Sequence, residues 1–239
     1  MKVFIASYKI LPELRGALER EGEVVLLSEN AYLPFPEAAH ADMQVYDAGS
    51  GSLTVKNGLC PEACAKLISL GFELTFAGRT APQKYPECAS LNVLKCGNYI
   101  LHKLSATDPA IMDLAAAGTL VFVNVSQGYT GCSSVYVDDL DLIVSGDPSV
   151  IKASAKHSFN LFRVEDEVTA GIELEGLPHG FIGGACGYDR DSKTFYVNGN
   201  LEKQLPALYN MLRSAGVRVV QAESEEKLFD IGGIKTAVS

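Results

Sequence analysis

A repeated order of strand, tight turn, strand, helix and strand limits the possible folds of this chain more than any other feature. The order is clearest in residues 128–164. Proline favours the first turn of a helix because its φ is preset, and Asp just before it can cap free N–H groups. The unit comprises an apolar run at 134–137, a turn at Asp138-Asp139, a second run at 140–144, a helix from Asp147-Pro148 to about residue 156, and a strand at 159–164.

Similar openings occur near residues 40, 85, 128, 179 and 228, which makes the units 43–51 residues long. The last opening is followed by one strand only, whereas the first 39 residues hold a strand, a helix and a strand without an opening. Joining the two ends completes a fifth unit, so we predict a ring of ββαβ units that the last strand closes, without exposed sheet edges. The prediction is one domain over 1–239, with units near 40–84, 85–127, 128–178, 179–227, and 228–239 joined with 1–39.

A doubly wound α/β sheet is the alternative fold. It requires single strands that alternate with helices. The paired strands that precede each helix in this chain favour the ring.

The charge pattern excludes some classes of partner. The net charge is −9, from 20 basic and 29 acidic residues, and no run of five like charges occurs. An acidic surface without basic stripes argues against nucleic acid. It suits a small cationic ligand, although the same charge can simply keep a surface well hydrated. No apolar stretch reaches the roughly 18 residues that a membrane span needs.

The six cysteines indicate a reducing compartment. No signal-peptide pattern precedes them and a chain of this length needs no disulfides, so we expect reduced thiols and a cytoplasmic location. Cys60 and Cys64 have the spacing of half a zinc site, but no second pair of Cys or His lies nearby. The glycine pairs at 183–184 and 232–233 do not lead from a strand into a helix as phosphate loops do. We therefore expect neither a metal ion nor a cofactor.

The openings carry a resemblance to a known fold. They read His40-Ala41-Asp42-Met43, Gly128-Tyr129-Thr130-Gly131-Cys132-Ser133, His179-Gly180-Phe181-Ile182-Gly183-Gly184 and Asp230-Ile231-Gly232-Gly233. A five-fold ring with such openings resembles the pentein, or guanidino-group-modifying-enzyme, fold, and more narrowly an uncharacterised bacterial family of that fold. The superfamily includes arginine deiminases, amidinotransferases, dimethylarginine hydrolases and a ribosome anti-association factor that is not an enzyme. The resemblance implies a five-fold α/β-propeller whose openings meet near the axis.

The resemblance also implies a chemistry for the openings. Enzymes of this superfamily attack a guanidinium carbon with a Cys thiolate, while a His moves protons and carboxylates bind the planar cation. By this resemblance, the expected roles fall on six residues: Cys132 as nucleophile, His40 and His179 as proton carriers, and Asp42, Asp230 and Glu87 as ligands of a small cationic substrate.

Each candidate also has a simpler interpretation. In a strand, His40 and Asp42 would share a face, but His40 can merely end a loop while Asp42 binds backbone N–H groups. Glycine beside Cys132 leaves its thiol approachable, although a free Cys is more often a buried core residue. Cys88 is a second candidate thiol. Asp230 is either a carboxylate at the mouth of the ring or a turn residue.

The chain departs from the superfamily in two places. The nucleophilic Cys belongs in the last unit, but residues 232–239 contain none, and the His-x-Asp pair belongs in the middle of the chain. A pentein-fold protein that only binds a ligand or a protein partner is therefore an alternative. A metal-dependent hydrolase that uses His40, Asp42 and His179 is a third. The sequence does not indicate an oligomeric state.

Overall fold

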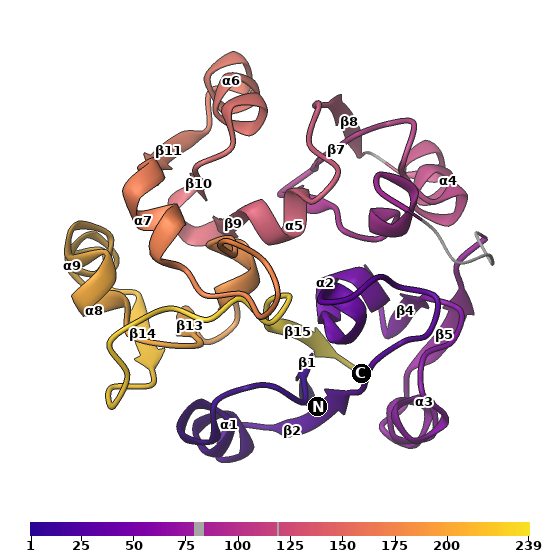
Figure 1. Cartoon of the computed structure of the whole chain (residues 1–239). Coiled ribbons are helices and arrows are strands. Elements are labelled where there is room, and N and C mark those ends of the chain that lie inside the picture. The colour runs from indigo at the N-terminus through magenta and orange to yellow at the C-terminus, as the bar shows by residue number, and fades with distance from the viewer. Residues whose placement is uncertain (79–83, 119) are drawn as a thin grey trace.

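The computed structural model describes residues 1–78, 84–118 and 120–239, so residues 79–83 of the first expected unit lie outside it. Five three-stranded sheets surround a central axis, and the longer helices lie at the rim (Figure 1). The strands are β3 Val45–Gly49, β4 Ser52–Val55, β5 Glu73–Phe76; β6 Leu94–Cys96, β7 Tyr99–His102, β8 Val121–Asn124; β9 Ser134–Val137, β10 Leu142–Ser145, β11 Asn160–Arg163; β12 Cys186–Asp189, β13 Thr194–Val197, β14 Arg218–Gln221; and β15 Lys235–Val238, β1 Lys2–Ser7, β2 Glu23–Leu27.

Every sheet has the same topology. The first strand of each group pairs antiparallel with the second, which pairs parallel with the third. The first strands contact one another around the axis, as β15 does with β3 and β12, and β9 with β6 and β12. A parallel pair needs a crossover connection, and in each unit a helix supplies it.

The C-terminal strand closes the ring. β15 pairs antiparallel with β1, with Lys2 opposite Val238 and Ile5 opposite Lys235. The two chain ends therefore meet in one sheet, as Figure 1 shows. The expected five-fold α/β-propeller, sealed by its last strand, is confirmed.

The helices begin as their sequences indicate. Proline occupies the first turn of α1, α3, α4, α6 and α9, and Asp147 accepts the backbone N–H groups of Ser149 and Val150 at the start of α6. Residues 201–214 form two helices and not one, because Pro206 begins a new helix. The helices are α1 Pro12–Glu19, α2 Ala41–Gln44, α3 Pro61–Ser69, α4 Pro109–Ala117, α5 Thr130–Ser133, α6 Pro148–His157, α7 Asp166–Gly171, α8 Leu201–Gln204 and α9 Pro206–Ser214, with 3-10 turns η1 Glu37–Ala39, η2 Glu87–Ala89, η3 Asp138–Leu140 and η4 Gly183–Ala185.

The openings differ from the expected strands. The strand of the first opening begins only at Val45, and His40 directly precedes the single helical turn α2. Likewise α5 and η4 precede β9 and β12. His40 and Asp42 therefore do not share a strand face. A helical turn, not an extended strand, sets the direction of the side chains that reach the axis.

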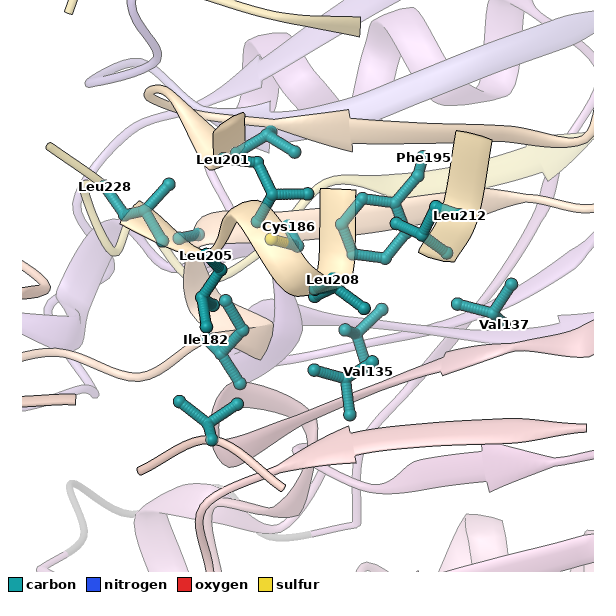
Figure 2. Close-up of a cluster of buried hydrophobic side chains, with 14 of the residues drawn as sticks. Val135, Val137, Ile182, Cys186, Phe195, Leu201, Leu205, Leu208, Leu212 and Leu228 are labelled. Carbon is teal, nitrogen blue, oxygen red and sulfur yellow. The ribbon is translucent and has the colours of Figure 1, made fainter. Parts of the chain in front are cut away.

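Apolar side chains fill the space between neighbouring units. Figure 2 shows Val135 and Val137 of β9 in one cluster with Phe195 of β13 and with Leu208 and Leu212 of α9. Cys186 lies buried in the same cluster. Among the described residues, no helix is long and apolar enough to cross a membrane.

Candidate active site

The openings of the first and third units bring three chemical groups together on the axis. The Cys132 thiol donates a hydrogen bond to Asp42 Oδ2 at 2.8 Å, and its sulfur lies 3.9 Å from His40 Nδ1. The residues are almost fully buried, with exposed fractions of 3% for His40, 1% for Asp42 and 2% for Cys132. The structure thus gathers a thiol, an imidazole and a carboxylate that are far apart in the chain.

Asn92 holds the thiol from the second unit. Its side-chain amide donates to Cys132 Sγ at 3.1 Å, and its Oδ1 accepts the Cys132 backbone N–H at 3.0 Å. Sequence reasoning did not select this residue. A signal was present, because Asp42, Asn92 and Cys132 each lie two or three residues before an inner strand.

Asp230 contributes a second carboxylate. Its Oδ1 lies 3.9 Å from His40 Nε2, and its oxygens accept the backbone N–H groups of Phe181 at 2.8 Å and Gly232 at 3.0 Å. Asp230 is therefore a turn residue and also a carboxylate beside the axial cluster. Its role as a ligand of a substrate remains a prediction.

Glycine is required where the chain passes these groups. A Cβ on Gly184 would lie 1.9 Å from Asp230 Oδ1, and a Cβ on Gly232 would lie 2.2 Å from the Cβ of His40. Gly232 also has a φ of +78°, which other residues rarely adopt. The two glycine pairs of the sequence thus make room for the imidazole and the carboxylate.

A cavity of about 260 Å³ leads to the cluster. His40, Cys132 and Asp230 form its polar end, and Leu174, Leu177 and Phe181 contribute an apolar wall. His179 is half-buried in the same wall, where its ring meets Phe181 edge-on with centroids 5.8 Å apart. A second cavity, of about 590 Å³, runs between the inner strands and reaches Asp42.

The structure places Glu37, not Glu87, at the cavity. Glu37 is half-buried on η1, lines the cavity and faces the Tyr129 hydroxyl. Glu87 occupies the matching position on η2 but is exposed and does not line this cavity. The repeated Pro-Glu pair at 36–37 and 86–87 was the signal that could have pointed to both. Cys88 is buried and 3.5 Å from the Tyr129 hydroxyl, outside the cavity lining.

Burial sets the protonation of the cluster. It raises the pKa of the Cys132 thiol well above its usual value, and the carboxylates of Asp42 and Asp230 raise it further. Burial also raises the pKa of Asp42 to about 6 and that of Asp230 to about 7, where the Asp42 charge adds to the effect. It lowers the pKa of His40 to about 3. Without a bound cation, the thiol and the imidazole are therefore neutral at pH 7.

A five-fold ring of ββαβ units with chemical groups gathered on its axis defines the class: this is a pentein fold. The chain belongs to a family of unknown function, DUF6873, whose model matches residues 5–235. Among curated proteins, none matches the chain.

Solved structures share the fold at low sequence identity. DDAH from Pseudomonas aeruginosa, a mutant complexed with citrulline, is 10% identical with a TM-score of 0.56, and the match covers 94% of this chain and 92% of that one. Inosamine-phosphate amidinotransferase StrB1 from Streptomyces griseus is 14% identical with a TM-score of 0.56, covering 92% and 75%. The N-terminal domain of ArgZ, a mutant covalently bound to a reaction intermediate, is 12% identical with a TM-score of 0.55, covering 92% and 90%.

Proposed function

We propose that this protein is a Cys-dependent enzyme that modifies a guanidino or amidino group of a small cationic substrate, as a hydrolase or a transferase. One observation carries the proposal: the 260 Å³ cavity ends at the Cys132 thiol and has the carboxylates of Glu37 and Asp230 in its lining. The similarity in fold to an amidinotransferase and to a DDAH complexed with citrulline supports the same reaction class.

A guanidinium cation matches the charge and shape of this cavity. It stays protonated at neutral pH and presents its N–H donors in one plane, which suits carboxylate acceptors. Burial raises the pKa of both Glu37 and Asp230, so each carboxylate gains from a neighbouring positive charge. The apolar wall at Leu174 and Leu177 would pack the aliphatic part of the substrate. The volume suits a small molecule.

The bound cation would also activate the nucleophile. Its charge opposes the burial and the carboxylates that keep the Cys132 thiol protonated, and Asp42, which accepts the thiol hydrogen bond, is placed to take the proton. The sulfur then forms a bond to the central carbon and an amine leaves with a proton. Water or an acceptor amine next attacks this carbon and the C–S bond breaks, which regenerates the thiol. His40 and His179, on the cavity wall, are the proposed proton carriers for the amine and the attacking group.

The alternative is a pentein-fold protein that binds a ligand or protein partner without catalysis. The 2% exposure and raised pKa of the Cys132 thiol favour this second function, because a nucleophile must be reached and ionised. The cytoplasmic location remains a prediction.

Labelling with a haloacetamidine separates the two functions. This cationic alkylating agent should modify Cys132 alone, and faster than neutral iodoacetamide does, because the carboxylates would concentrate the cation beside the thiol. Peptide mass spectrometry identifies the modified residue, and Cys186→Ser, at an equally buried thiol in the core, is the matched control. Equal inertness of all cysteines toward the cationic reagent would leave only the binding function.

A further inference from the structure

We infer that His40, Asp42 and Cys132 form a binding site for one divalent transition-metal ion of the zinc class. One imidazole nitrogen, a carboxylate oxygen and the sulfur all lie within 4.8 Å of one another, and all three residues are buried. This site goes beyond the proposed function, because it requires no guanidine and no turnover. It also differs from the cysteine pair at positions 60 and 64, on which the expectation of no metal rested.

The distances fit one ion. Zinc binds nitrogen, oxygen and sulfur at about 2.0–2.3 Å, so its ligand atoms lie about 3.3–3.7 Å apart on a tetrahedron. The separation of Cys132 Sγ from His40 Nδ1 is 3.9 Å, and that from Asp42 Oδ2 is 2.8 Å, on either side of this range. The third separation, from His40 to Asp42, is within 4.8 Å, so side-chain movements of roughly 1 Å would suffice for all three atoms to bind a common centre. Three protein ligands leave a fourth position, which the cavity beside His40 and Cys132 can supply.

An unpartnered oxygen points independently to a ligand. Within the described part of the chain, Asp42 Oδ1 is buried and accepts no hydrogen bond, although the Asn92 amide lies close enough to the carboxylate to lower its pKa. Buried carboxylate oxygens are normally paired, and one without a hydrogen-bond partner calls for an explanation, of which a bound ion is one. A metal ion bound by the Asp42 carboxylate would give this oxygen, like Oδ2, a positively charged partner.

The surroundings resemble those of metal sites. A His that binds a metal usually presents its other ring nitrogen to a carboxylate, and His40 Nε2 lies 3.9 Å from Asp230 Oδ1. The Asn92 amide donates to the sulfur at 3.1 Å and would stabilise a thiolate. A thiolate and the Asp42 carboxylate together balance a charge of +2. Sulfur and imidazole ligands favour zinc, cobalt or copper over magnesium or calcium.

A metal on Cys132 and attack by Cys132 exclude each other, because the same sulfur electrons serve both. A divalent ion of this class should therefore protect the thiol from haloacetamidine. Metal binding itself is measured without substrate, so the inference and the proposed function can fail separately.

Cobalt substitution tests the inference. The purified chain is treated with a chelator, freed of it, and titrated with Co²⁺ in a reducing buffer without thiols. We expect one ion per chain, a sulfur-to-cobalt charge-transfer band and the visible bands of a tetrahedral site, all displaced by Zn²⁺. Cys132→Ser should abolish the charge-transfer band, and the isosteric Asp42→Asn should weaken binding at least about 100-fold, since even outer contacts of metal sites contribute 10–100-fold.

The controls keep the result decisive. Cys186→Ser removes an equally buried thiol of the core and should bind as the parent chain does. Circular dichroism establishes that each variant is folded. The inference is overturned if a folded parent chain binds no stoichiometric Co²⁺, or if Cys132→Ser and Asp42→Asn bind it with unchanged affinity.

Discussion

At the scale of the residue, Cys132 is defined by its neighbours. Asp42 accepts from the thiol, Asn92 donates to it, and His40 lies 3.9 Å away. Two nearby carboxylates make this an unfavourable place for an isolated thiolate and a favourable one for a bound cation. The proposed guanidinium substrate and the inferred metal ion are two different cations that these carboxylates would stabilise.

Asn92 is expected to be a positioning residue for Cys132. Asn92→Ala removes the donor to the sulfur and leaves the buried Cys132 N–H without its partner, so it should lower the free energy of unfolding by about 1–3 kcal/mol. It should also slow haloacetamidine labelling of Cys132 at least about tenfold, because nothing orients the thiol. Urea unfolding and timed mass spectrometry measure the two effects.

The matched control is Asn160→Ala, at an exposed side chain that donates to the Leu140 carbonyl. Loss of this exposed amide should change the free energy of unfolding by less than about 0.5 kcal/mol and leave the labelling of Cys132 unchanged. Wild-type labelling of the Asn92→Ala variant would show that the amide does not position the thiol.

At the scale of the element, the helical turns of the openings matter most. The turns α2 and α5 end where β3 and β9 begin, so Asp42 and Cys132 point to the axis from just before their strands. The loop before β15 follows another route, through Gly232, and places Asp230 beside His40. The openings can therefore pack this closely around the axis only because glycine, which has no side chain, occupies the positions nearest to Asp230 and His40.

Gly184→Ala tests this close packing. Its new methyl group would lie 1.9 Å from Asp230 Oδ1 and 2.3 Å from Asp230 Cγ, so that the carboxylate must move. We expect the free energy of unfolding to fall by about 2–3 kcal/mol or more, because overpacking forces backbone shifts. Urea unfolding measures the loss.

Gly16→Ala is the opposite case within the same chain. Gly16 lies inside α1, and its nearest neighbour is the flexible end of Arg20 at 3.7 Å. Alanine should therefore stabilise the protein by about 0.5–1 kcal/mol. If Gly184→Ala and Gly16→Ala had the same free energy of unfolding, the tight fit around Asp230 would be refuted.

At the scale of the whole molecule, polar contacts join neighbouring units of the ring. The Glu21 carboxylate accepts from the Tyr196 hydroxyl at 2.7 Å and from Arg218 at 2.6 Å. Lys2 pairs with Asp189 across the same boundary. These contacts connect the unit that contains both chain ends to the preceding unit.

Glu21→Gln should lower the free energy of unfolding at neutral pH, where the Glu21 carboxylate is charged, and have little effect at acidic pH. Burial by itself raises the pKa of Glu21, but the hydrogen bonds from Arg218 and Tyr196 outweigh it and hold the pKa below its usual value. A carboxylate with a lowered pKa in the folded state stabilises above its unfolded pKa, and this contribution is lost as the pH falls through the folded value. The variant should be less stable than the parent chain by about 1 kcal/mol at pH 7, and the difference should shrink as the pH falls through the lowered pKa of Glu21. Urea unfolding at pH 7 and at successively lower pH values, with exposed Glu73→Gln as control, tests this, and a difference that persisted unchanged at low pH would contradict it.

Much of the architecture follows from local sequence alone. Helices in this chain begin at proline, often after a capping Asp, and end near glycine, and these signals act within a few residues. Their repetition predicted the five units, the ring and its closure by the last strand. The same repetition selected the openings that carry His40, Asp42, Cys132 and Asp230, which the structure brings together. The chemical roles of these residues remain proposals.

The tertiary structure decided which side chains face one another. The openings are helical turns rather than strands, and a turn of this kind rotates Asp42 toward Cys132 by an amount that no periodicity reveals. Asn92 and Glu37 joined the site, and Glu87 stayed at the surface, because these positions depend on how one unit packs against the next. The elevated pKa of the Cys132 thiol has the same origin, since burial and the nearness of two carboxylates from distant units exist only in the closed ring.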